Sequence, residues 1–263
     1  MSDITILSDN AVGIFRPTRL LAEWGFCAAV ESVLFDTGLT GVAKDNAARL
    51  GMDPGAFDTI VLSHGHHDHT GGIEEFLIDN PDVYLHPDAW QPRYKDGVHN
   101  GFPFTRERIE DGANVIEHTE PVEVAPGIWA LGEIPRTYPD NPSGKRRVDG
   151  TLVDDHVPDD QALAVETADG IAVVLGCCHS GMRNTIEHAE DVLDDTVRII
   201  VGGTHLIGRD HDGVATVAAW LDEKPSLEVV ATCHCTGQAA EATLHSTIED
   251  RFMPVGVGST IDL

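Results

Sequence analysis

The chain has 263 residues, with 44 Asp plus Glu against 17 Lys plus Arg and a formal net charge of −27. Such a surface repels nucleic acid and anionic membranes, so neither is expected as a partner, and a small-molecule substrate is favoured. The acidic residues are scattered along the whole chain, as in the acidic surfaces of halophilic proteins from cells with molar internal salt. At such salt the Debye length falls to about 3 Å, and the fold should weaken in dilute buffer.

Length and hydropathy favour a single cytoplasmic domain over residues 1–263. The sequence has no run of about 18 or more apolar residues, and Met1-Ser2-Asp3-Ile4 lacks the basic and apolar regions of a signal peptide. Four of the five cysteines form the pairs Cys177-Cys178 and Cys233/Cys235, each beside a histidine. This arrangement suits a reduced compartment better than a disulfide framework.

In chain order, the sequence alternates short β-rich runs with helical patterns. Strands are expected at Ile4–Leu7, Ala28–Val30, Val33–Phe35, Thr59–Leu62, Val83–Leu85, Ile128–Leu131, Ala162–Glu166, Ile171–Leu175, Ile199–Val201 and Val229–Ala231. Helices are expected over 40–51, 73–79 and 182–193, and between and after the last strands. Residues 91–127 and 137–160 are polar and turn-rich and are predicted to be irregular excursions near an active site. The mixed pattern favours an αββα sandwich, with two sheets face to face and helices outside.

A histidine-rich loop follows the strand expected at Thr59–Leu62. Its residues His64, His66, Asp68 and His69 form an H-x-H-x-D-H pattern. Imidazole nitrogens and a carboxylate at this density suit zinc. The first two histidines point to one side in extended backbone and can share an ion, which leaves the last two residues for a second ion. A solvated loop is the alternative, and it is disfavoured because the loop follows a buried strand.

Three further histidines also follow predicted strands, namely His179, His205 and His234. Strand ends can bring distant loops to one edge of a sandwich, so all three are candidate site residues. Other interpretations stay open: His179 could cap a helix, His234 could be a buried strand-end residue, and His205 could contact metal or substrate or lie in the core.

The H-x-H-x-D-H loop is the signature of the metallo-β-lactamase superfamily, which the sequence resembles. The resemblance implies an αββα fold and two zinc ions with a bridging hydroxide. The di-iron branch typically has Glu where this chain has His66, which favours hydrolysis over oxygen reduction. Further motifs resemble the subfamily named for 7,8-dihydropterin-6-methyl-4-(β-D-ribofuranosyl)-aminobenzene 5′-phosphate synthase, many members of which are known as metal-dependent hydrolases. These motifs are Leu34–Gly38, Val61–Gly72, Gly132–Arg136, Asp159–Leu163, Gly176–Gly181, Gly202–Leu206 and His234–Gly237.

The third ligand of the first zinc usually comes from a Pro-Gly-His turn in this superfamily. Here the corresponding place is Leu131-Gly132-Glu133, which has no histidine. His179 is therefore expected to complete the first site with the first two loop histidines, and His234 to complete the second with Asp68 and His69. Whether Cys177, Cys178 or a hydroxide alone bridges the ions stays open.

Three other residues are candidates for supporting roles. Asp36 follows a predicted strand and is expected to orient a metal-bound histidine. Arg136 and Arg183 are scarce positive charges near the expected site. They could hold a substrate phosphate or carboxylate, or could form surface salt bridges.

These residues predict a hydrolase that uses two divalent metal ions, with zinc the expected metal. Two such ions would lower the pKa of a shared water toward about 7 and so provide hydroxide for attack on an ester or phosphoester. Asp68 is expected to act as the catalytic proton acceptor. One alternative is a synthase that condenses a phosphorylated precursor with a pterin, in the pathway of a methanopterin-type cofactor. Another is a ligand sensor on the same scaffold, which the full set of candidate ligands disfavours.

Overall fold

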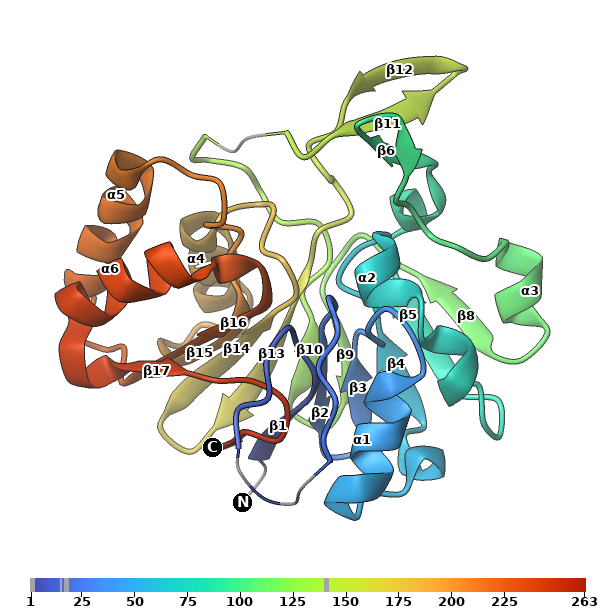
Figure 1. Ribbon diagram of the computed structural model, residues 1–263, viewed down its shortest axis with the longest axis horizontal. Helices are drawn as coiled ribbons and strands as arrows, with labels where there is room; N and C mark the ends of the chain where they lie inside the picture. Colours follow the sequence, from blue (N-terminus) through green and yellow to red (C-terminus); the bar gives the residue numbers. More distant parts are fainter. Residues whose placement is uncertain (1–2, 15, 17–18, 140–141) are drawn as a thin grey trace.

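The computed structural model describes residues 3–14, 16, 19–139 and 142–263. Two seven-stranded sheets pack face to face, and helices cover both outer faces (Figure 1). The predicted αββα sandwich is therefore confirmed. No helix in the described ranges has the length and apolar character needed to cross a membrane.

The first sheet has the strand order β18-β1-β2-β3-β4-β5-β8. Its strands are β1 (Asp3–Ser8), β2 (Cys27–Val30), β3 (Val33–Phe35), β4 (Thr59–Val61), β5 (Asp82–Leu85), β8 (Asn114–Glu117) and β18 (Thr260–Asp262). The run from β3 to β8 is parallel, so the carboxyl ends of these strands lie at one edge.

The second sheet has the order β17-β16-β15-β14-β13-β10-β9. Its strands are β9 (Val122–Ala125), β10 (Ile128–Ala130), β13 (Ala162–Thr167), β14 (Gly170–Leu175), β15 (Val197–Gly203), β16 (Val229–Cys233) and β17 (Phe252–Pro254). The run from β14 to β17 is parallel, which again collects carboxyl ends at one edge.

Successive side chains of a strand point to opposite faces of its sheet. One set therefore packs against the other sheet, and the other set packs against helices on the outer face. Along β14, Ile171 and Val173 pack against helices, while Ala172 and Val174 face the other sheet. Helices α4 (Met182–Leu193), α5 (His211–Asp222) and α6 (Gln238–Ile248) cover the second sheet, and α1 (Val42–Leu50) covers the first (Figure 1). Shorter helical turns are α2 (His67–Thr70), α3 (Arg106–Glu110), η1 (Pro54–Ala56), η2 (Ile73–Phe76), η3 (Pro87–Trp90), η4 (His234–Thr236) and η5 (Glu249–Arg251).

The expectation that 91–127 is irregular is wrong for much of that segment. It contains α3 together with β8 and β9, which are the edge strands of the two main sheets. Edge strands are half exposed and polar, so their apolar pattern is weak. The helix expected over 73–79 is only the short turn η2.

Residues 137–160 are also more regular than predicted. They contain the hairpin of β11 (Lys145–Val148) and β12 (Thr151–Asp154), which projects beyond the sandwich (Figure 1). This hairpin joins β6 (Arg93–Lys95) and β7 (Val98–His99) in a third, four-stranded sheet. Most side chains of β11 and β12 are exposed, so the sequence carries no buried alternation there.

Candidate metal centre

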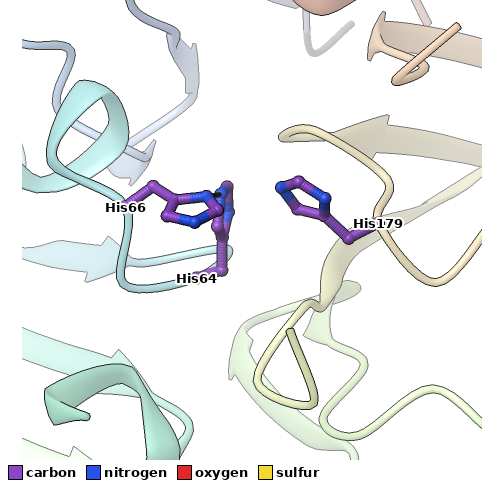
Figure 2. A group of neighbouring side chains, drawn as sticks. All are labelled: His64, His66 and His179. Carbon is purple, nitrogen blue, oxygen red and sulfur yellow. Dashed lines mark hydrogen bonds between the residues drawn. The ribbon is translucent and has the colours of Figure 1, made fainter. Parts of the chain in front are cut away.

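The loops that follow β4, β14, β15 and β16 meet at one edge of the sandwich, because these strands run parallel within their sheets. Figure 2 shows the result for three histidines: His64 and His66 come from the loop after β4, and His179 faces them from the loop after β14. The structure thus brings these three histidines together from the ends of different strands, as the sequence predicts.

His64, His66 and His179 form the first group of candidate ligands. One ring nitrogen from each lies within 4.8 Å of the others, and all three residues are buried. Nε2 of His64 is 2.8 Å from Nδ1 of His66. Both ring nitrogens of His179 and Nε2 of His66 are buried without a hydrogen-bond partner among the described residues.

A chain of hydrogen bonds fixes the tautomer of His64. The hydroxyl of Ser63 donates to Oδ2 of Asp36 at 2.7 Å. The hydroxyl oxygen of Ser63 can then accept a hydrogen bond from Nδ1 of His64, at 2.8 Å. The proton of His64 therefore lies on Nδ1, and Nε2 offers its lone pair to the group.

Asp68, His69 and His234 form the second group, again with ligand atoms within 4.8 Å of one another. Nδ1 of His69 donates to Asp36 Oδ2 at 2.7 Å, so its Nε2 is free to bind an ion. Nε2 of His234 is buried, lacks a hydrogen-bond partner within the described chain, and lies 3.8 Å from Asp68 Oδ2. Nε1 of Trp24 donates to that same carboxylate oxygen at 3.0 Å.

Cys177 lies between the two groups. Its Sγ is 3.1 Å from Nε2 of His69, and it clusters both with His64 and His69 and with His234 and Cys235. Cys178 points elsewhere: its Sγ is 3.6 Å from Oγ1 of Thr185, and it packs in the helix-side core. Of the two cysteines predicted as possible bridging ligands, only Cys177 is placed to reach both positions.

The electrostatics of the first group favour neutral imidazoles. Burial lowers the pKa of His64, His66 and His179 well below the usual range, and neighbouring positive groups lower these pKa values further. All three rings are therefore uncharged at neutral pH and can offer lone pairs to a cation.

The second group, by contrast, contains two charged side chains, the carboxylate of Asp68 and the imidazolium of His69. Burial acts to raise the pKa of Asp68, but His69 and His234 outweigh it and hold that pKa at about 2. Burial acts to lower the pKa of His69, but Asp36 and Asp68 outweigh it and raise that pKa to about 9. In the metal-free protein His69 is therefore an imidazolium beside the carboxylate of Asp68. An incoming cation would displace a proton from His69.

This donor set fits divalent cations. Buried nitrogens without partners are costly unless something satisfies them, and here several converge with a carboxylate and a thiol. Nitrogen, oxygen and sulfur donors in this combination are those that zinc prefers.

Four residues at this edge have left-handed backbone, which L side chains rarely adopt. They are Asp36, Cys178, His205 and His234, with φ values of 60°, 59°, 48° and 51°, and each follows a strand end. Such residues cost about 1–3 kcal/mol each and cluster at functional sites.

A buried ion network supports the histidine loop from behind. Arg93 is fully buried, and its Nε donates to Asp155 Oδ2 at 2.8 Å while its Nη2 donates to Asp159 Oδ1. The other oxygen of Asp159 accepts from the backbone N–H of Gly65 at 2.8 Å. A side chain at Gly65 would collide with Ala89 and with this guanidinium, so the glycine allows the close approach.

The remaining predicted residues divide into two kinds. The ring of His205 lies 4.3 Å from that of His179 and lines the cleft over the two groups. Arg136 instead donates to the backbone carbonyls of Val157 and His179, at 2.7 Å and 3.4 Å, and does not line this cleft. Arg183 pairs with Glu187 at 2.9 Å.

The cleft has a volume of about 430 Å³. Its walls include Trp24, Lys95 and Asn100, which the sequence analysis did not single out. Trp24 belongs to none of the motifs in the sequence, and Lys95 lies in the segment 91–127, which is predicted to be irregular. Residues of the β6–β7 hairpin, which belong to the segment 91–127, line this cleft.

The sequence model of the Metallo-beta-lactamase superfamily matches residues 30–177. That range holds the histidine loop and ends at Cys177. The chain therefore belongs to the metallo-β-lactamase superfamily.

Similar proteins extend this relationship over almost the whole chain. The 7,8-dihydropterin-6-methyl-4-(beta-D-ribofuranosyl)-aminobenzene-5′-phosphate synthase of Methanocaldococcus jannaschii is 29% identical and covers 98% of this chain and 95% of its own. An uncharacterized protein of the same organism, MJ0448, is 30% identical over 89% of this chain and 90% of its own. The crystal structure of Tm1679, a metal-dependent hydrolase of the beta-lactamase superfamily, has a TM-score of 0.90 at 26% identity and covers 100% of this chain and 99% of that one.

Proposed function

We propose that the protein is a metal-dependent hydrolase that holds two divalent cations, with zinc the expected metal, and acts on a small soluble ester or phosphoester. One observation carries the proposal: buried imidazole nitrogens without partners converge with a carboxylate on the floor of an open cleft. Membership of the superfamily and the similarity to Tm1679 support it.

The two groups of side chains would hold one cation each. His64, His66 and His179 would provide the first position, and Asp68, His69 and His234 the second. When bound, two such cations lower the pKa of a shared water toward about 7 and stabilise negative charge that develops on the substrate.

The protein's own groups would position the ligands and move the proton. Asp36 holds His69 and, through Ser63, His64 in the tautomers that leave Nε2 free. Asp68 is ionised at neutral pH, so its carboxylate can take up the proton that the attacking water loses. The indole N–H of Trp24 holds one of the two carboxylate oxygens of Asp68 in place.

A synthase reaction is the second candidate, supported by the similarity to the Methanocaldococcus jannaschii synthase. A condensation needs two organic substrates, whereas hydrolysis needs one and water. Product analysis with single substrates therefore separates the two functions.

The first test is elemental analysis of protein purified in high salt. We expect two equivalents of metal in the wild type, with clear losses in His64→Ala and His179→Ala. His211→Ala is the matched control, because this histidine is 84% exposed on α5 and belongs to neither group. Metal content that does not change in His179→Ala would refute the ligand assignment, and protein without metal would favour a ligand sensor.

A further inference from the structure

Lysine is scarce in this acidic chain, which has only four. Lys44, Lys145 and Lys224 each form an ion pair with a neighbouring carboxylate, at 3.0, 2.5 and 2.9 Å. The side-chain ammonium of Lys95 has no ion-pair or hydrogen-bond partner anywhere in the described ranges, and Lys95 lines the cleft over the candidate metal centre. A free ammonium at this place is notable, because 44 acidic residues offer partners elsewhere.

The β6–β7 hairpin holds Lys95 in position. Lys95 ends β6 and pairs with Val98 across a two-residue turn, Asp96-Gly97, whose positive φ values suit a tight hairpin. Two residues earlier, the buried guanidinium of Arg93 ties β6 to Asp159, which in turn binds the histidine loop. The position of the hairpin over the cleft is therefore coupled to that of the candidate metal ligands.

His205 faces the same cleft. It belongs to none of the groups of candidate ligands that the described residues form. An imidazole ring carries at least one N–H, so His205 can donate a hydrogen bond to a group bound in the cleft.

We infer that Lys95 binds an oxyanion of the substrate, a phosphate or a carboxylate, in this cleft, and that His205 donates a hydrogen bond to the same group. An ammonium recognises such an anion through charge-assisted hydrogen bonds. Acidic side chains also line the cleft: Asp68 is a proposed metal ligand, and Asp96 lies at the tip of the hairpin turn. The inference rests on the proposed function and narrows its substrate class to anionic esters.

The first test measures binding rather than turnover. Inorganic phosphate is titrated into the metal-loaded protein by calorimetry at fixed ionic strength, because salt screens exposed charges. Lys95→Gln should weaken phosphate binding roughly tenfold, the effect expected for one lost charge-assisted hydrogen bond, and Lys95→Arg should retain most of the affinity. Lys44→Gln is the matched control. Lys44 lies on α1, is paired with Glu75 and does not line the cleft. Equal phosphate affinity in Lys95→Gln and wild type would overturn the inference.

A second test identifies which anion the substrate carries. The 4-nitrophenyl esters of acetate and succinate share a leaving group and an ester bond, but only the succinate ester carries a carboxylate. Lys95→Gln should raise KM for the succinate ester about tenfold and leave the acetate ester unchanged if a carboxylate is recognised. The KM of Lys95→Gln and of the wild type for 4-nitrophenyl phosphate gives the corresponding comparison for a phosphate group. If phosphate binding depends on Lys95 but no ester is hydrolysed, the inference stands and the proposed hydrolase function fails.

Discussion

The carboxylate of Asp36 joins both groups of candidate metal ligands through one oxygen. Oδ2 accepts from Nδ1 of His69 and from the hydroxyl of Ser63, each at 2.7 Å, and Ser63 in turn holds His64. One buried side chain therefore sets the ring orientation in both proposed metal positions.

Replacing Asp36 should weaken metal binding without removing a ligand. Asp36→Asn is the preferred variant, because Asn tolerates the left-handed backbone at this position. We expect a loss of about 10–100-fold in metal affinity, the usual effect of removing a carboxylate behind a metal-bound histidine. Competition with a chelator measures it. Asp45→Asn, which changes an exposed carboxylate on α1, should bind metal as the wild type does.

Cys177 should contribute a thiolate to the metal centre. Burial raises the pKa of this thiol, so a cation would have to displace its proton. In cobalt-substituted protein, a thiolate ligand produces a charge-transfer absorption in the near ultraviolet. We expect this band in the wild type and in Cys178→Ser, whose side chain faces the helix core, but not in Cys177→Ser. A band that survives in Cys177→Ser would assign the ligand to another thiolate, such as Cys235 in the same cluster. A wild type without the band would show that no sulfur binds the ions.

The buried network of Arg93 should be needed for stability. Arg93→Met keeps the bulk of the side chain but leaves Asp155 and Asp159 buried without their partner. Removing one member of such a pair typically costs about 3–5 kcal/mol. Denaturant unfolding at fixed salt and metal concentration measures the loss. Arg106→Met removes an exposed arginine and should change little, so equal effects in both variants would contradict the prediction.

Asp160 should make stability depend on pH. Burial raises the pKa of this carboxyl from 3.8 to about 6, despite a hydrogen bond from the N–H of Ser180 at 2.8 Å. Protonated Asp160 therefore favours the folded state fully below about pH 4, and this contribution is lost as the pH rises through about 6. Relative to the wild type, Asp160→Asn should become more stable as the pH is raised from 4.5 to 7. Thermal unfolding at matched metal concentration tests this, and a difference independent of pH would contradict it.

The sequence predicts the main sheets and the gathering of histidines well, for a physical reason. Buried strands such as β4 and β14 are continuous apolar runs, and His64 and His179 follow them closely. The third sheet escapes prediction because its hairpin is exposed and carries no apolar alternation.

Contacts between distant residues are beyond this kind of reasoning. Arg93 lies 62 and 66 positions from its two carboxylate partners, and no local pattern links them. Arg136 is a candidate phosphate-binding residue by its scarcity alone, and its hydrogen bonds to the backbone carbonyls of Val157 and His179 follow from no local pattern. Lys95 could be recognised only once the hairpin was placed over the cleft.

The candidate ligands come from both halves of the sandwich: His64 follows a strand of the first sheet and His179 a strand of the second. A cation between them would act as a cross-link, comparable to the disulfide that joins two sheets in many extracellular domains. The five cysteines are all buried and free, so none provides such a covalent link. The edge that binds substrate would then also be the seam along which the two layers separate most easily when the ions are withdrawn.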